Sequence, residues 1–262
     1  TRAFTHQPAH TMTQHLAITQ TGPVAHITLT MPEIRNAFSD EVIQAIPGAF
    51  ADVGTRADVR AVVLAAEGPA FCAGANLHWM RRMADYTRDE NLADAGKLAT
   101  MLCTIAECPK PTIARVQGDV YAGGMGLVAA CDMAVSVDTA WYCLSEVKIG
   151  LAPATISPYV IRAMGTRAAQ RYFLTAERFT AAEAHHIGFV HEVVAADALD
   201  ATGQADDREL AKDVRTFLDK HQGMNATPEV FAAHHARIIA ADQSRVAKPA
   251  PDRPPNDRGR GR

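Results

Sequence analysis

Residues 112–137, TIARVQGDVYAGGMGLVAACDMAVSV, carry the clearest indication of fold class in the chain. The two ends of this stretch, Thr112–Val116 and Met133–Val137, are apolar and rich in β-branched residues, which predicts two strands. Between them, Gly118–Ala122 predicts a turn and Gly123–Ala130 predicts a helix. A strand, a helix and a second strand in this order form a parallel unit, because the helix carries the chain back across the sheet. The stretch therefore predicts an α/β fold.

The same alternation extends outward in both directions. Upstream, the pattern predicts the hairpin Leu16–Thr21 with Val24–Thr30, a helix from the N-cap Ser39 to about Val53, the buried strand Ala61–Ala65 and the helix Arg88–Ala106. Pro47 is expected to bend or end the first helix, and Gly68–Leu77 is expected to be a loop. Downstream, helices are predicted over Ile156–Met164, Ala168–Leu174, Ala181–His186 and Asp206–Lys220, with one strand at Phe189–Val194.

Composition limits the class of protein. The chain has 262 residues, of which 48% are apolar and 21% are charged, so wholesale disorder is excluded. The net charge of −3 gives no basic field, so neither nucleic acid nor a membrane is an expected partner. None of the five cysteines forms a CxxC pair, so no metal site is expected, and reduced thiols in a cytoplasmic protein are predicted.

Composition also divides the chain into four parts. Residues 1–11 lack the apolar region of a signal peptide and are expected to be a disordered leader before a natural start at Met12. Residues 12–200 form the predicted core. Residues 201–247 are expected to be a helical region, and residues 248–262, rich in Pro and Arg, a disordered tail.

Two glycine-containing segments are candidates for binding chemistry. They are FCAGANL at 71–77 and GDVYAGGMG at 118–126, each after a predicted strand. Small residues let a ligand approach the main chain, so backbone N–H groups can bind an oxyanion, and those of Gly123 and Gly124 would lie at a helix N-terminus. The alternative is that these glycines only form tight turns. Neither segment has the spacing of a nucleotide-binding loop.

One carboxylate, Glu146, stands among apolar residues in WYCLSEVKIGL at 141–151. Loss of solvation would raise its pKa toward neutrality, which suits a general acid or base. An ordinary salt bridge, for instance with Lys148, is the alternative.

Several of these segments resemble the enoyl-CoA hydratase/isomerase (crotonase) superfamily over roughly residues 14–200. The segments that carry the resemblance, in the family's order, are IRNAF at 34–38, FCAGANL, AGGMGLVAACD at 122–132, LSEVKIGL at 144–151 and ERFTAAEAHHIGFVHEVV at 177–194. The resemblance implies a spiral of ββα units with a helical C-terminal region, assembled as a homotrimer or homohexamer. It also implies an acyl-CoA thioester substrate and no metal or redox cofactor, with coenzyme A present only as part of the substrate.

The resemblance further implies roles for individual residues. Glu146 would be the catalytic acid or base, and the backbone N–H groups of Ala75 and Gly123 would bind the thioester oxygen. Contacts to coenzyme A would come from Ile34, Arg35, Ala37, Ala73, Gly74, Ala75, Asn76, Leu77 and Gly124. Family hydratases often carry a second glutamate, whose position corresponds here to Gly126, and the space left there is expected to hold substrate or water.

The missing second glutamate and the segment GLAPATISPYV at 150–160 make the chain similar to bacterial methylglutaconyl-CoA hydratases. The leading hypothesis is an enoyl-CoA hydratase with one catalytic glutamate, acting on a thioester such as 3-methylglutaconyl-CoA in leucine degradation. His78, Arg81 and Arg82 are the candidates for holding the distal carboxylate of such a substrate. The alternative enzyme is a Δ3,Δ2-enoyl-CoA isomerase, and the alternative outside enzymes is a non-catalytic acyl-CoA-binding or RNA-binding relative.

Overall fold

The structure is a computed structural model that describes residues 11–12 and 15–199. All described residues belong to one compact unit of the chain. Four predicted features lie outside the described residues: the leader up to residue 10, the helix Asp206–Lys220, the region 201–247 and the tail 248–262.

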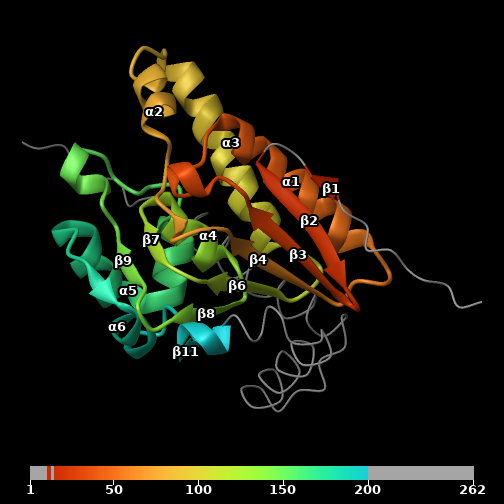
Figure 1. The fold of residues 1–262 in the computed structure, drawn as a ribbon. Helices are drawn as coiled ribbons and strands as arrows, with labels where there is room; N and C mark the ends of the chain where they lie inside the picture. Colours follow the sequence, from red (N-terminus) through yellow and green to blue (C-terminus); the bar gives the residue numbers. More distant parts are fainter. Residues whose placement is uncertain (1–10, 13–14, 200–262) are drawn as a thin grey trace, which may run out of the picture. The chain divides into compact units, whose positions relative to one another are not determined.

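A seven-stranded sheet has the order β1-β2-β3-β4-β6-β8-β11 (Figure 1). Its strands are β1 Thr11–Met12, β2 Leu16–Thr21, β3 Val24–Leu29, β4 Ala61–Ala66, β6 Thr112–Val116, β8 Met133–Val137 and β11 Glu192–Val194. The first three strands pair antiparallel, which confirms the hairpin, and every later pair in this sheet is parallel. All six residues of β4 are buried, as expected for a strand that is covered on both faces.

A smaller sheet has four strands in the order β10-β9-β7-β5. Its strands are β5 Ala70–Cys72, β7 Asp119–Tyr121, β9 Trp141–Cys143 and β10 Phe179–Thr180. β5, β7 and β9 run parallel, and β10 is antiparallel to β9. The predictions of a loop at Gly68–Leu77 and a turn at Gly118–Ala122 were therefore incomplete. Each segment contains a three-residue strand, which is too short to show an alternating pattern.

The chain visits the two sheets in turn. β4 leads into β5, β6 into β7 and β8 into β9, and helical segments follow each pair. These segments are α2 Leu77–Met83 with α3 Arg88–Ala106, then α4 Gly123–Ala130, then the short helix η2 Glu146–Ile149 with α5 Ser157–Thr175. This repetition confirms the predicted spiral of ββα units, and it places the end of each short strand directly before a helical segment.

Two helices differ from their predictions. Helix α1, Asp40–Thr55, begins after the expected N-cap Ser39 but continues through Pro47. Buried side chains on both sides of the proline, such as Ile43 and Phe50, hold α1 against the core, and tertiary packing outweighs the lost backbone bond. Helix α5 joins the two predicted helices across a kink at Gly165, where φ is 76° and ψ is 160°.

The remaining elements are short. A single helical turn, η1 Pro32–Ile34, follows β3, and α6 Ala181–His186 lies where it was predicted. The strand predicted over Phe189–Val194 is limited to β11. Within the described ranges, no helix combines the length and apolar character that crossing a membrane requires.

Candidate active site

Three of the predicted functional segments lie at one edge of the smaller sheet. Residues 73–76 follow β5, residues 122–124 follow β7, and residues 144–146 follow β9. The three strands are parallel neighbours, so their carboxyl ends meet at the same edge. Ligand sites of open α/β sheets are typically found at this edge, because the loops that leave it converge there.

The two glycine loops are in direct contact. A Cβ atom added to Gly74 would lie 2.9 Å from the Cβ of Ala122, 3.1 Å from the carbonyl oxygen of Tyr121 and 3.5 Å from the backbone nitrogen of Gly123. Gly74 has φ +90°, a conformation that L-residues rarely adopt. Glycine is therefore required here both for its backbone conformation and for the close approach of the second loop.

The second loop holds a strained residue at the start of α4. Ala122 has φ 47° and ψ −121°, which costs a non-glycine residue about 1–3 kcal/mol. Its N–H donates to the carbonyl oxygen of Cys143 at 2.8 Å, so β9 holds the loop in this conformation. Such strain is typical of functional loops, and it persists only where contacts with the surrounding structure hold the strained conformation.

Each loop presents a backbone N–H that no hydrogen bond between described residues engages. In the first loop, Gly74 donates to Cys72 and Asn76 donates to Phe38, while the N–H of Ala75 makes no such bond. In the second loop, the N–H of Gly123 is likewise unengaged at the first position of α4. The structure thus brings the two predicted oxyanion donors onto neighbouring loops.

Glu146, the predicted acid or base, lies at this edge. It begins η2, and its Oε2 atom is buried with no hydrogen-bond partner in the part of the chain that the structure describes. Burial raises the pKa of the Glu146 carboxyl, as the sequence predicted. Among the described residues, no ion pair joins Glu146 to Lys148, the partner that the salt-bridge alternative named.

Comparison with known proteins identifies the family. A family model described as enoyl-CoA hydratase/isomerase matches residues 19–244 of the chain. The chain belongs to the enoyl-CoA hydratase/isomerase family.

Two relatives and one solved structure show the breadth of this family. A Thermus thermophilus protein, provisionally named as an enoyl-CoA hydratase, is 36% identical over 197 residues, or 75% of this chain and 78% of that protein. A Mycobacterium tuberculosis protein, named (7aS)-7a-methyl-1,5-dioxo-2,3,5,6,7,7a-hexahydro-1H-indene-carboxyl-CoA hydrolase, is 33% identical over 215 residues, or 80% and 85% of the two chains. The crystal structure of an enoyl-CoA hydratase from Shewanella pealeana is similar with a TM-score of 0.71, 37% identity and 88% coverage of both chains. The named reactions differ, so membership alone does not fix the reaction.

The family's expected coenzyme A loop, residues 34–37, lies beside the first glycine loop. Ala73 donates to the carbonyl of Arg35 at 2.9 Å, and Phe38 donates to that of Gly74 at 3.0 Å. Ile34 is 40% exposed and Leu77 is 65% exposed, so the predicted contact residues at both ends are open to a ligand. The structure therefore brings Ile34, Arg35 and Ala37 together with Ala73, Gly74, Ala75, Asn76 and Leu77.

Asn36 shapes this loop and was missed by sequence reasoning. It is fully buried, and its side chain accepts from the N–H of Met31 and donates to the carbonyls of Glu67 and Ala70 at 2.8–2.9 Å. Arg35 and Asn36 both have positive φ, at 52° and 53°. An asparagine beside such a turn was the available signal, since Asn tolerates this conformation better than most residues.

The buried side chain of Cys72 contacts the coenzyme A loop and both glycine loops. Its Sγ lies 3.2 Å from the carbonyl oxygen of Asn36 and accepts from the N–H of Gly74 at 3.4 Å. Burial raises the pKa of the Cys72 thiol to about 12, so the thiol stays protonated and can donate to Asn36. A Cβ on Gly124 would lie 2.8 Å from the Cβ of Cys72, so this residue also touches the second loop.

The candidates for holding a distal carboxylate lie on α2. Asn76 is the N-cap of α2, and its side chain accepts from the N–H groups of His78 and Trp79. Arg82 forms an ion pair with Asp40 at 2.9 Å, so it is already engaged. His78 and Arg81 are exposed. Elsewhere in the described part of the chain, no three His, Cys, Asp or Glu side chains gather as a metal-ligand set.

The space beside Gly126 differs from its prediction. A Cβ added to Gly126 would lie 2.3 Å from Cγ2 and 2.9 Å from Cβ of Ile156. The prediction that substrate or water occupies this space is therefore wrong. The side chain of Ile156 fills it, and the sequence could not show this because Ile156 lies in an irregular segment far along the chain.

Proposed function

We propose that this family member is an enoyl-CoA hydratase that works with a single catalytic carboxylate, Glu146. The supporting observation is that three groups lie at the same edge of one sheet. They are the buried Oε2 of Glu146 and the backbone N–H groups of Ala75 and Gly123, none of which has a hydrogen-bond partner among the described residues. A buried polar atom without a hydrogen-bond partner lowers the stability of the fold. Such an atom is expected in an active site, because a bound substrate can supply the missing hydrogen bond.

The proposed reaction adds water across the α,β double bond. Glu146 accepts a proton from water while the water oxygen bonds to the β-carbon, and the electron pair of the double bond moves to the thioester oxygen. Glu146 then returns the proton to the α-carbon, the enolate collapses to the thioester, and the carboxylate is restored. The raised pKa of Glu146 suits both transfers, because a proton carrier works best near the operating pH.

The N–H groups of Ala75 and Gly123 bind the thioester oxygen in this proposal. Charge grows on that oxygen as the enolate forms, so fixed donors stabilise the transition state more than the ground state. Removal of one such donor typically costs about 3 kcal/mol. Contacts between the two loops, fixed by Gly74 and Ala122, hold the donors in place without reorganisation.

Coenzyme A is expected along residues 34–37 and 73–77. Arg35 is the exposed cation of the first loop, and a guanidinium binds phosphate with strong, directional hydrogen bonds. Within the acyl part, a glutaconyl-type substrate carries a distal carboxylate that requires a cation. His78 and Arg81 on α2 are the exposed candidates, since Arg82 is paired with Asp40.

A Δ3,Δ2-enoyl-CoA isomerase is the second candidate, and the single carboxylate favours it. Isomerisation moves one proton from C2 to C4, or the reverse, which one glutamate can perform alone. In this structure position 126 is filled by Ile156, so no second acid is available there.

Incubation of the full chain with crotonyl-CoA, 3-methylglutaconyl-CoA and a 3-enoyl-CoA separates these reactions. We expect at least one of the first two to gain the mass of one water and lose its conjugated absorbance. A conjugated product of unchanged mass from the 3-enoyl-CoA alone would identify an isomerase. Thermal stabilisation by the thioesters without any turnover would identify a binder.

The assembly and location remain part of this proposal. A homotrimer or homohexamer working in the cytoplasm is expected from the family resemblance, and light scattering of the purified chain tests the assembly. A monomer at micromolar concentration would contradict it.

A further inference from the structure

Ile156 and Gly126 form a close contact beside helix α4. Gly126 lies on α4 three residues after the oxyanion donor Gly123, so both are on the same side of the helix. Ile156 directly precedes α5 and is 3% exposed. Leu102 of α3 closes the same space, 3.5 Å from the position of an added Cβ.

Space, rather than backbone conformation, restricts position 126. Gly126 has no positive φ, so its helical backbone suits any L-residue. The atoms in the way are Cγ2 and Cβ of Ile156, and a β-branched side chain is stiff at χ1. Ile156 cannot rotate away from an added side chain unless its own backbone moves. Position 126 is therefore closed to every residue with a Cβ.

We propose that Ile156 closes position 126 to a second carboxylate and so leaves proton transfer to Glu146 alone. This inference rests on the proposed function, because it concerns the same site. Ile156 and Glu146 lie on the same connecting segment, between β9 and α5. The segment between β9 and α5 thus carries both Glu146, the proposed acid or base, and Ile156, which excludes a second carboxylate. A second carboxylate would interact with Glu146 and shift both titrations.

The first test is a thermal-unfolding cycle, which needs no substrate. It compares the wild type with Gly126→Glu, Ile156→Gly and the double variant, because glycine removes both Cγ2 and Cβ of Ile156. Overpacking lowers the Tm of Gly126→Glu by roughly 5–10 °C, and the cavity left by Ile156→Gly also lowers it. The double variant regains at least half of the loss caused by Gly126→Glu. Equal losses in the two backgrounds would show that Ile156 does not close position 126 and would overturn the proposal.

The second test is the pH dependence of crotonyl-CoA hydration. It compares Gly126→Glu/Ile156→Gly with Gly126→Gln/Ile156→Gly, a matched pair that differs only in an ionisable group. The glutamate form has an additional ionisation in kcat/KM that the glutamine form lacks. Identical profiles would show that position 126 does not face the thioester, which would also overturn the proposal.

The two tests separate this inference from the proposed function. If the wild type hydrates no enoyl-CoA, the proposed function fails while the unfolding cycle still decides whether Ile156 closes position 126. If the wild type is a hydratase and the cycle is additive, the proposed function stands and the role of Ile156 fails.

Discussion

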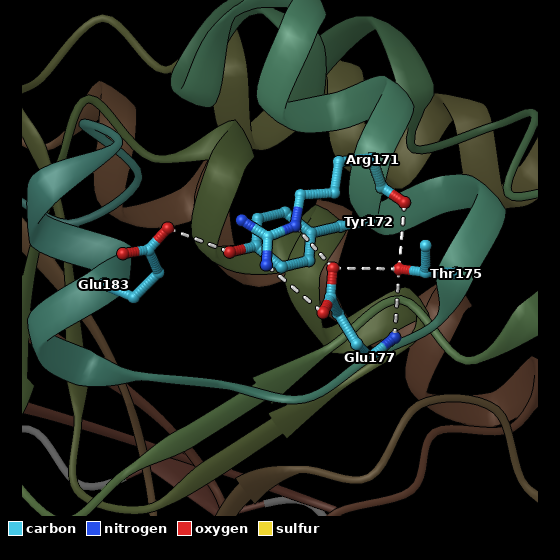
Figure 2. Close-up of polar contacts among 5 residues, drawn as sticks. All are labelled: Arg171, Tyr172, Thr175, Glu177 and Glu183. Atoms are coloured by element: carbon cyan, nitrogen blue, oxygen red, sulfur yellow. Dashed lines mark hydrogen bonds and ion pairs between the residues drawn. The ribbon is translucent and has the colours of Figure 1, made fainter.

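Two polar regions of the molecule treat their glutamates in opposite ways. At the end of α5, Arg171 donates to both carboxylate oxygens of Glu177, and the Thr175 hydroxyl lies 3.2 Å from one of them (Figure 2). Tyr172 donates to Glu183 of α6 at 3.0 Å, so the cluster ties two helices together. At the candidate active site, by contrast, a buried oxygen of Glu146 has no hydrogen-bond partner among residues 11–12 and 15–199.

The pKa values reflect this difference. Hydrogen bonding to Arg171 lowers the pKa of the Glu177 carboxyl, while burial raises that of Glu146. A paired carboxylate is stabilised in its charged form and is a poor proton carrier at neutral pH. The ion pair with Arg171 gives Glu177 a structural role. The carboxyl of Glu146 has a buried oxygen without such a partner and is therefore available to a substrate.

The largest expected effect separates the two glutamates by activity. Glu146→Gln keeps the side chain's size but removes the transferable proton, so turnover should fall by about 10²–10⁴. Glu177→Gln is the matched control and should leave kcat unchanged. Turnover of thioesters by both variants is the measurement. If Glu146→Gln keeps more than about a third of wild-type turnover, another group carries the proton.

The next effect concerns the contact between the glycine loops. Gly74→Ala puts a Cβ 2.9 Å from Ala122 and displaces the oxyanion donors, so kcat/KM should fall by about 10²–10³. Gly165→Ala is the control, because Gly165 of α5 also has positive φ (+76°) but no described atom lies within 4 Å of its added Cβ. An equal loss in both variants would show that backbone strain, not loop contact, causes the effect.

A smaller effect is expected for the coenzyme A loop. Arg35→Ala should raise KM for CoA thioesters about tenfold and leave kcat nearly unchanged, because the lost phosphate contact is shared by the ground and transition states. Arg88→Ala, at an exposed arginine of α3, should change neither constant. A fall in kcat at unchanged KM would place Arg35 elsewhere in the mechanism.

The two glutamates should also differ in how stability depends on pH. The raised pKa of Glu146 means that its stability contribution is present at low pH and lost as pH rises through that pKa. The Tm of Glu146→Gln relative to wild type should therefore rise with pH. Glu177 has a lowered pKa and contributes stability above about pH 4 that is lost as pH falls, so the Tm of Glu177→Gln should decrease relative to wild type with rising pH. Parallel curves for the two variants would contradict the comparison.

The smallest effect belongs to the structural cluster alone. Tyr172→Phe removes the donor to Glu183 and should lower Tm by roughly 2–4 °C, the effect of about one hydrogen bond. Because the cluster lies outside the proposed chemistry, kcat should not change. A loss of kcat larger than about twofold would show that the cluster supports the active site.

The candidate site was predicted from motifs, yet its supporting residues were not. Ala75, Gly123 and Glu146 stand in short segments whose order resembles the family, and the structure brings those segments to one sheet edge. Asn36 and Cys72 position the loops through contacts with residues more than thirty positions away. Asn36, for example, donates a hydrogen bond of 2.9 Å to the carbonyl oxygen of Ala70, and Cys72 contacts the carbonyl oxygen of Asn36. No local pattern signals such contacts.

The sequence by itself determined the longer elements, because hydrophobic periodicity is a local property and survives without knowledge of neighbours. The buried strand β4 and the helix α3 were predicted with at most one residue of difference. Tertiary structure alone decided the three-residue strands β5, β7 and β9, the passage of α1 through Pro47, and the filling of the space at Gly126 by Ile156. Each of these depends on which distant segments pack together, since packing energy outweighs local preference wherever an element is short or irregular.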